Sequence, residues 1–223
     1  MKRKSLSVTK KTPNFYLTKL KDPQVRKLYN LFSNNLASMD LTNKKIMVGV
    51  SGGADSLAVL FFSQCYALKH HTKLYPVIID HKLRKESTIE AKNLKYKLKQ
   101  NFEINCKILS KKIVKINKNI QSYARDLRYD LFFEECNKQK IDYLILGHHK
   151  DDLIENFFIR FLRGSGLKGL VSFNKNVIII NGINVIRPFL STSKKDLLKI
   201  NCLLYTSDAA DEGLGVDLGG RRI

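Results

Sequence analysis

Residues 51–56 read SGGADS, a hexapeptide whose glycines, hydroxyls and single carboxylate could bind a phosphate chain. An apolar run, KIMVGV at 45–50, precedes it, and an apolar helical pattern follows it. Gly52 and Gly53 allow a ligand to approach the backbone, and a helix beginning near Asp55 offers unpaired N–H groups with partial positive charge. The hexapeptide lacks the lysine of the Walker pattern and does not match G-x-G-x-x-G. It therefore predicts a phosphate-binding loop of another kind, with a tight strand-to-helix turn as the alternative.

The carboxylate of Asp55 needs a reason, because it would repel the phosphates that the loop is suited to bind. One interpretation is an ordinary helix N-cap, worth about 1 kcal/mol. The other is a ligand of Mg²⁺, which proteins commonly hold through one or two carboxylates together with phosphate oxygens of the substrate. The residues alone leave both open, and the second predicts ATP with Mg²⁺ as the bound species.

A second polar segment, DHKLRKES at 80–87, follows another apolar run. Asp80, His81 and Arg84 leave the end of the expected strand together, where such side chains can reach a nucleotide. A solvated turn leading into the next helix explains them equally well.

A third segment, GHHKDD at 147–152, concentrates histidines and carboxylates. Four simultaneous metal ligands are implausible here, because neighbouring side chains at a strand-to-helix turn diverge. We expect one or two of them to face the ligand and the others to cap the following helix. The candidates are Gly147, His148, His149, Asp151 and Asp152.

Alternating strands and helices must position these segments. The hydrophobic pattern predicts strands at 45–50, 73–80, 103–109 and 143–146, and helices at 23–39, 55–68, 87–102, 121–138 and 151–162, after a basic leader at 1–22. This order predicts an α/β fold, an open parallel sheet with helices on both faces. Ligands of such sheets bind beyond the carboxyl ends of the strands, so the three segments should converge.

The composition bounds the protein further. Its 223 residues suffice for one well-packed α/β domain. The net charge of +20 would attract a polyanion, but lysine, asparagine and isoleucine abound together as codon bias would produce, so charge alone leaves nucleic acid open. No apolar run reaches the roughly 18 residues of a membrane span, and the N-terminus lacks a signal-peptide core, so we expect a cytoplasmic protein without a membrane partner. The four cysteines are scattered without a C-x-x-C pair, which favours reduced thiols.

Two arginine pairs could contact phosphates. Arg125 and Arg128 lie on the helix expected at 121–138, where ion pairs with neighbouring carboxylates are the alternative. Arg160 and Arg163 lie three residues apart and precede the glycine-rich stretch GSGLKG, which contains Lys168. Such a basic edge suits nucleic-acid phosphates, although a solvated charged face is equally common.

These motifs, in this order, carry a family resemblance. SGGADS resembles the PP-loop of the N-type ATP pyrophosphatases, which cleave ATP between its α and β phosphates. Four further segments are similar to one branch of that superfamily, the tRNA isoleucine lysidine synthetases: DHKLRKES at 80–87, ARDLRYDLF at 124–132, GHHKDDLIENFFIRFLRGSGLKGL at 147–170 and IRPFL at 186–190. The match covers residues 44–199 and departs at Leu153 and Asn156, where the family usually has Gln and Thr.

The resemblance implies that ATP adenylates the C2 oxygen of the wobble cytidine in tRNA(Ile) with a CAU anticodon, and that free L-lysine then displaces AMP to give lysidine. It implies nucleotide contacts from a large set of residues: Ser51, Gly52, Gly53, Ala54, Asp55, Ser56, Asp80, His81, Arg84, Gly147 and His148. The resemblance also implies catalytic roles for Asp55, Arg128, Asp151 and Asp152. It further implies that Asp55 binds Mg²⁺. RNA contacts would come from Arg160, Arg163 and Lys168.

Two other functions stay open beside this one. A tRNA cytidine thiolase of the same superfamily has a similar His-His-x-Asp-Asp motif, but it would need paired cysteines for sulfur transfer or a cluster. A non-catalytic ATP- or RNA-binding module is the second alternative.

The composition changes abruptly near the end of the chain. We expect a basic leader and helix at 1–43, a catalytic ATP-binding domain at 44–201 and an atypical tail at 202–223. From 203 to 223 there is no lysine, four acids stand against two arginines, and four of the chain's 12 glycines occur. Because the resemblance ends there too, we expect a truncated or chimeric reading frame with a non-native or disordered tail, with a native tail as the alternative.

Overall fold

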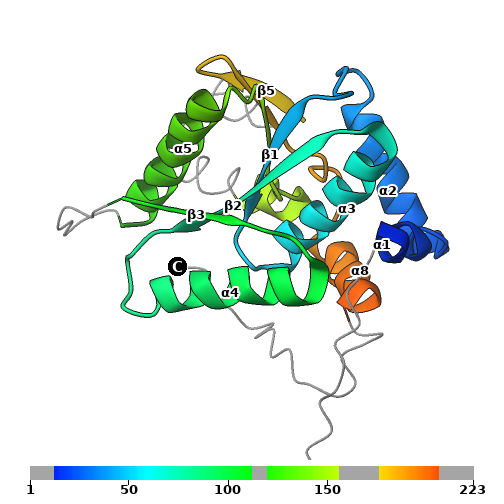
Figure 1. The fold of residues 1–223 in the computed structure, drawn as a ribbon, viewed down its shortest axis with the longest axis horizontal. Helices are drawn as coiled ribbons and strands as arrows, with labels where there is room; N and C mark the ends of the chain where they lie inside the picture. The colour runs from blue at the N-terminus through cyan, green and yellow to red at the C-terminus, as the bar shows by residue number, and fades with distance from the viewer. Residues whose placement is uncertain (1–12, 112–119, 156–175, 206–223) are drawn as a thin grey trace, which may run out of the picture.

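A six-stranded sheet forms the centre of the computed structural model, which describes residues 13–111, 120–155 and 176–205. The spatial order of the strands is β3-β2-β1-β4-β6-β5. Their bounds are β1 Lys45–Val50, β2 Lys73–Asp80, β3 Lys107–Ser110, β4 Tyr143–Ile145, β5 Val177–Ile180 and β6 Ile183–Ile186. Figure 1 shows the strands crossing the middle of the molecule, with helices packed around them.

The sheet is mostly parallel, which confirms the expected α/β fold. β1 pairs in parallel with β2 and β4, β2 with β3, and β4 with β6. The edge strand β5 adds one antiparallel pair to the expected parallel sheet. A two-residue turn, Asn181 and Gly182 with φ of 51° and 79°, joins β5 to β6, and such positive angles are what a tight hairpin requires.

Helices cover both faces of the sheet. They are α1 Pro13–Lys19, α2 Pro23–Leu36, α3 Ala54–His70, α4 Ser87–Phe102, α5 Ile120–Gln139 and α8 Lys194–Tyr205. Residues of α1, α2, α3, α4 and α8 share one apolar core with one face of β1 and β2. The other core lies between α5 and the opposite sheet face, where Phe132 and Cys136 meet Met47 and Val77. α3 is therefore the central helix, buried between the sheet and the helices outside it.

Both ends of β1, β2 and α4 were predicted correctly from the sequence. β3, by contrast, begins four residues later than expected. Glu103 adopts a left-handed conformation, with φ of 56°, that ends α4. The N–H of Ile104 then donates to the carbonyl of Leu98 at 3.1 Å and caps the helix. Residues 103–106 are consequently a helix-ending connection, and β3 starts only at Lys107.

The N-terminal and C-terminal parts also differ from expectation. The leader contains α1, whose Tyr16 is buried and donates to the carbonyl of Phe102 at 2.6 Å. β5, β6 and α8 were not predicted, and α8 continues to Tyr205, across the boundary expected after residue 201. The helix expected at 151–162 is present at 150–155, and its remainder lies outside the described residues. Within the described ranges, no helix is both long and apolar enough to span a membrane.

Candidate nucleotide-binding site

The phosphate loop, residues 51–56, joins β1 to the first turn of α3 and is held together by the hydroxyl of Ser56. This buried hydroxyl donates to the carbonyl of Gly53 at 2.9 Å and accepts from the N–H and the hydroxyl of Ser51, both at 3.1 Å. Gly52 has a φ of +84°, and a Cβ there would lie 3.1 Å from Leu94 Cδ2 on α4. Gly53 is the N-cap of α3 without a side-chain cap, so the first N–H groups of the helix can serve an anion.

Gly147 brings the end of β4 against this loop. A Cβ on Gly147 would lie 3.0 Å from the backbone carbon and oxygen of Asp55 and from the nitrogen of Ser56. Such contacts with backbone are tighter than nearly all Cβ contacts, so a side chain here would require the backbone to shift, and glycine permits the close approach. The first and third polar segments of the sequence therefore converge, as the parallel sheet predicts.

Asp55 and His149 are the side chains that meet at this junction. Asp55 lies in the first turn of α3, and since Gly53 is the N-cap, the N-cap interpretation of Asp55 is wrong. The Nε2 of His149 lies 3.3 Å from Asp55 Oδ2 and 3.5 Å from Asp152 Oδ2. His149 is 1% exposed, so this imidazole is the buried centre of three carboxylates, the third being Asp151 at 3.7 Å from Nδ1.

The carboxylates hold the pKa of His149 above its ordinary value. Burial is the largest single effect and lowers the pKa, but the hydrogen bond to Asp55 and the charges of Asp152, Asp55 and Asp151 together outweigh it. The backbone N–H of Asp152 points at Nδ1 from 3.4 Å, which leaves Nε2 to donate to Asp55. The sequence identified the histidine as a candidate but gave it no role; its spacing from Asp55 could not reveal the contact.

One carboxylate oxygen of Asp55 is available to bind a cation. Its Oδ1 is buried and has no hydrogen-bond partner among the described residues, whereas Oδ2 contacts His149. In the described ranges, no three His, Cys, Asp or Glu side chains are arranged as a complete metal site. A cation would therefore depend on Asp55 Oδ1 together with ligands from the substrate, which is how Mg²⁺ commonly binds with phosphates.

Asp151 and Asp152 both accept backbone N–H groups. Asp152 Oδ2 accepts the backbone N–H of His149 at 3.0 Å and orders the turn that begins the helix at 150–155. Asp151 Oδ2 accepts the N–H of Lys194 at 2.7 Å and so joins the turn to the start of α8. Asp151 remains half exposed. Chemical roles for the two carboxylates stay predictions.

Asp80 is buried at the end of β2 and organises the second polar segment. Its Oδ1 accepts the N–H of Lys82 at 3.0 Å, and its Oδ2 accepts the hydroxyl of Thr88 at 2.7 Å. These contacts fix the turn into α4. Arg84, by contrast, is half exposed and paired with Glu90 on α4 at 3.2 Å, so the described contacts direct it along the helix. Nucleotide contacts from Asp80 and Arg84 stay predictions.

His81 meets Arg128 of α5, which joins the second segment to the opposite face of the sheet. The His81 Nε2 lies 3.3 Å from an Arg128 Nη2. Burial, then the charge of Arg128, lowers the pKa of His81 to about 4, so the neutral imidazole accepts from the guanidinium at neutral pH. The sequence interpretation that Arg128 pairs with a carboxylate of its own helix gains no support from this contact.

Arg125, Arg128 and Arg187 form a cationic group near His148. Burial, followed by the charges of Arg187, Arg125 and Arg128, lowers the pKa of His148 to about 3. The pKa values of Arg128 and Arg187 are also lowered, chiefly by burial and in part by Arg125. Arg187 follows β6 and is 1% exposed. The sequence missed it, although it lies in the quoted IRPFL segment.

Two outer helices support the site. Asn201 on α8 donates through Nδ2 to the carbonyl of Ala54, at the start of α3. Asn35 on α2 donates to the carbonyl of Pro188 at 2.7 Å, next to Arg187. Both supports depend on tertiary packing and left no recognisable pattern in the sequence. Arg160, Arg163 and Lys168 lie outside the described residues.

The chain matches the family model of the PP-loop domain over residues 20–212. The chain belongs to the PP-loop domain family. This PP-loop chain is 41% identical over 157 residues to the tRNA(Ile)-lysidine synthase of Orientia tsutsugamushi (strain Boryong), which covers 70% of the chain and 35% of that relative. It is 35% identical over 188 residues to the tRNA(Ile)-lysidine synthase of Wolbachia pipientis wMel, covering 82% of the chain and 43% of the relative. The PP-loop chain thus spans well under half the length of these curated relatives.

A solved structure confirms the fold at low sequence identity. The U34-tRNA thiolase NcsA from Methanococcus maripaludis, described with its [4Fe-4S] cluster, superposes with a TM-score of 0.67 at 19% identity. The similarity covers 82% of the PP-loop chain and 65% of the thiolase chain. At this identity the likeness concerns the fold alone.

Proposed function

We propose that this chain carries the ATP-dependent catalytic domain of a tRNA(Ile)-lysidine synthetase. In the proposed reaction, ATP activates the wobble cytidine of tRNA(Ile) with a CAU anticodon, and free L-lysine replaces AMP to give lysidine. The observation that carries the proposal is the 41% identity to the tRNA(Ile)-lysidine synthase of Orientia tsutsugamushi over 157 residues. The geometry of the strand ends supports it.

The first step is adenylation. The C2 oxygen of cytidine attacks the α-phosphorus of ATP, the bond to the bridging oxygen breaks, and pyrophosphate leaves. The uncapped start of α3 and the backbone near Gly52 and Gly53 would bind phosphate oxygens. Arg128 and Arg187, held with His148 in a largely buried cationic group, would stabilise the charge that develops on the α-phosphate.

The second step is displacement. The amino group of lysine attacks C2, the bond from C2 to the adenylated oxygen breaks, and AMP leaves. The attacking amine must lose a proton, and Asp151 and Asp152 are the carboxylates that we propose for its acceptance, since they follow β4 at the same edge as the phosphate loop. Asp151 is the more exposed of the two.

We propose Mg²⁺ as the accompanying cation. Asp55 would hold it through the buried Oδ1 that has no partner in the described part of the chain. When bound, the ion supplies positive charge that offsets the charge of the phosphates. The contact with His149 Nε2, 3.3 Å from Oδ2, would orient the same carboxylate.

A thiolase is the less favoured alternative. Cys65 lies on α3, Cys136 on α5 and Cys106 in the connection before β3, and burial raises the pKa of each thiol to about 12. Thiols with such values are poor nucleophiles at neutral pH. The remaining cysteine, Cys202, is exposed on α8. The PP-loop chain therefore lacks the paired, reactive thiols that sulfur transfer requires.

The decisive experiment is mass analysis of nucleosides from isoleucine tRNA after incubation with the protein, ATP and lysine. We expect a new cytidine derivative that carries the mass of lysine less water, and none when lysine is omitted. Because the chain spans only part of its relatives, tRNA-dependent exchange of pyrophosphate with ATP should be measured in parallel. Absence of both product and exchange, with ATP still bound, would favour the non-catalytic module instead.

A further inference from the structure

The helix α4 presents an exposed face that none of the site contacts uses. Its inner face is apolar: Ala91 and Leu98 are buried in the core, and Leu94 packs against Gly52 of the phosphate loop. Six exposed residues occupy the opposite face at helical spacing, and we call them the α4 outer face: Ile89, Lys92, Asn93, Tyr96, Lys99 and Gln100.

Two large side chains on this face lie in solvent. Tyr96 is 65% exposed and Ile89 is 61% exposed. The two residues lie about two helical turns apart on the same face of α4. Lys92 and Lys99 flank Tyr96 on the same face, and the face carries no carboxylate. An exposed aromatic ring between lysines is the arrangement that stacks on a nucleobase while the ammonium groups contact phosphates.

The charge of α4 is not a uniform consequence of lysine-rich composition. α4 has four lysines and one acidic residue, Glu90. α5 of the same chain has three basic and four acidic residues. The only acid of α4 is also engaged with Arg84. Positive charge is therefore concentrated on α4 and balanced on α5.

The position of α4 connects this face to the site. The helix begins directly after the turn organised by Asp80, and Thr88 in its first turn bonds that carboxylate. Exposed Lys82 and Lys85 precede it in the same turn. A basic path thus runs from the strand-end edge of the sheet along α4, which Figure 1 shows at the outside of the molecule below β3.

We propose that the α4 outer face is an RNA-binding surface on which Tyr96 stacks with an unpaired base and Lys92 and Lys99 contact the flanking phosphates. The partner class, an RNA with single-stranded nucleotides, rests on the proposed function. Charge complementarity and the exposed aromatic ring favour it over a protein partner, for which the lysine side chains would be costly to order.

Fluorescence anisotropy with a labelled anticodon stem-loop of isoleucine tRNA tests the surface on the full chain. Tyr96→Ala should weaken binding at least roughly fivefold through lost stacking. The double variant Lys92→Glu with Lys99→Glu should weaken it at least roughly tenfold and reduce the slope of log affinity against log salt by about two. ATP binding should not change in either variant.

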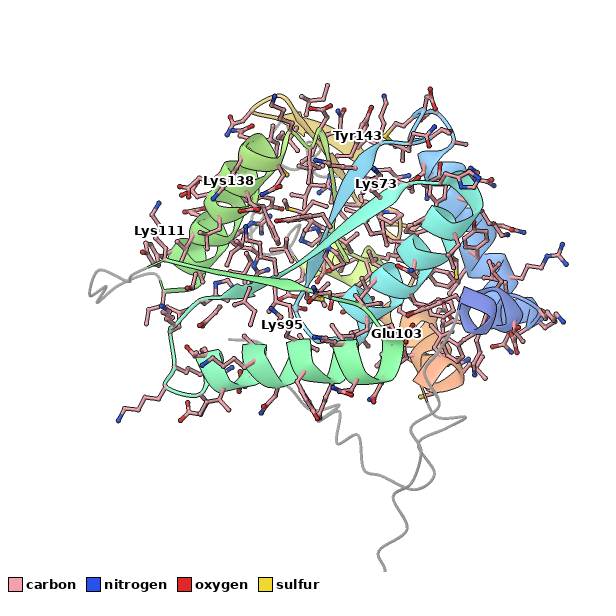
Figure 2. All side chains as sticks on the ribbon, viewed as in Figure 1. Lys73, Lys95, Glu103, Lys111, Lys138 and Tyr143 are labelled. Atoms are coloured by element: carbon pink, nitrogen blue, oxygen red, sulfur yellow. The ribbon has the colours of Figure 1, made fainter. Side chains whose placement is uncertain are left out.

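A matched control has the same change of charge elsewhere. Lys73 and Lys138 are exposed and lie away from α4 in Figure 2, so Lys73→Glu with Lys138→Glu should change RNA affinity less than about twofold if long-range charge matters little at physiological salt. Equal losses in the two double variants, or an unchanged affinity for Tyr96→Ala, would overturn the proposal.

The test separates this surface from the proposed function. If the α4 variants lose RNA binding while the wild-type chain forms no lysine adduct, the surface stands and the proposed function fails. If the wild-type chain forms the adduct and the α4 variants bind RNA normally, the reaction stands and the surface fails. A competition experiment with polyglutamate completes the test. If polyglutamate displaces the RNA equally from the wild type and from Tyr96→Ala, binding is a general polyanion effect and the proposal is overturned.

Discussion

The Nε2 of His149 lies 3.3 Å from Oδ2 of Asp55, so the carboxylate after β1 is paired with the imidazole after β4. The pair joins two strand ends that are separated by almost a hundred residues in the sequence. Burial lowers the pKa of His149, but this hydrogen bond and the neighbouring charges of Asp152, Asp55 and Asp151 together raise it above its ordinary value. Among the residues that the structure describes, Asp55 Oδ1 has no hydrogen-bond partner, so this oxygen is available to a cation.

Asp55→Asn should retain the fold and lose Mg²⁺-dependent adenylation. Asparagine keeps the volume but removes the charge that would hold the cation, so tRNA-dependent ATP–pyrophosphate exchange should fall roughly a hundredfold or more. The melting temperature should fall only slightly, since one charged hydrogen bond of about 1.5–3 kcal/mol is weakened rather than removed. Asp130→Asn, on the exposed side of α5, is the control and should be neutral in both measurements. Near-normal exchange of Asp55→Asn at ordinary Mg²⁺ would rule out the metal role.

Gly147 and Gly53 should respond differently to alanine. A Cβ at Gly147 would lie 3.0 Å from backbone atoms of Asp55 and Ser56, so Gly147→Ala should destabilise the fold by about 1–3 kcal/mol and displace the phosphate loop. A Cβ at Gly53 would meet only Ser51 Oγ at 3.7 Å, so Gly53→Ala should cost only the smaller preference for glycine over alanine at an N-cap, less than about 1 kcal/mol. Thermal unfolding with and without ATP measures both. An equal loss of stability in the two variants would contradict the packing argument.

Local patterns made part of this fold predictable. β1 and β2 are apolar runs bounded by polar segments, and α4 begins and ends where its helical pattern does, at Ser87 and Phe102. The convergence of the phosphate loop with Gly147 followed from the rule that the carboxyl ends of parallel strands share an edge. The β5–β6 hairpin also had a local signal, because an Asn-Gly pair stands between two apolar runs, but its antiparallel pairing was not inferred.

The remaining features depend on contacts between distant residues. Three features can be recognised only once the order of the strands in the sheet is known. They are the pairing of Asp55 with His149, the pairing of His81 with Arg128, and the burial of Arg187. α1 was not predicted because its seven residues are too few for a helical pattern to stand out, and packing of Tyr16 against α4 stabilises it. Propensity carries no information on such tertiary contacts.

Acid should destabilise the protein partly through His81. Its folded pKa, about 4, lies below the ordinary 6.5, so between these values the unfolded chain binds more protons and the free energy of unfolding falls as the pH falls. His81→Gln keeps an acceptor for Arg128 but cannot titrate, and its slope of stability against pH should be shallower by up to about one proton. Urea denaturation at several pH values from 7 to 4 measures the slopes. His148, with a folded pKa of about 3, adds a second contribution of the same sign that remains in the variant.

The control for this experiment is a histidine outside the site. His71 is exposed and adopts a left-handed conformation with φ of 54° after α3, which asparagine tolerates well. His71→Asn should leave the slope as in the wild type. The role of His81 would be refuted by an identical slope in His81→Gln and the wild type.

Asn201 should position the phosphate loop without touching the nucleotide. Its Nδ2 donates to the carbonyl of Ala54 in the first turn of α3, while Leu197 and Ile200 on α8 are buried in the core and hold the helix in place. Asn201→Leu removes the donor at similar volume, so α3 should keep its packing while its first turn loses one fixed contact. We expect the KM for ATP to rise roughly five- to tenfold, since one hydrogen bond contributes about 1 kcal/mol, with little change in kcat.

Lys199→Ala, at an exposed position of the same helix, should leave KM and melting temperature unchanged. If Asn201→Leu lowers the melting temperature by many degrees with KM intact, Asn201 supports the packing of α8 and not the loop. Rescue of the KM by Asn201→Gln would confirm that the donor itself is required.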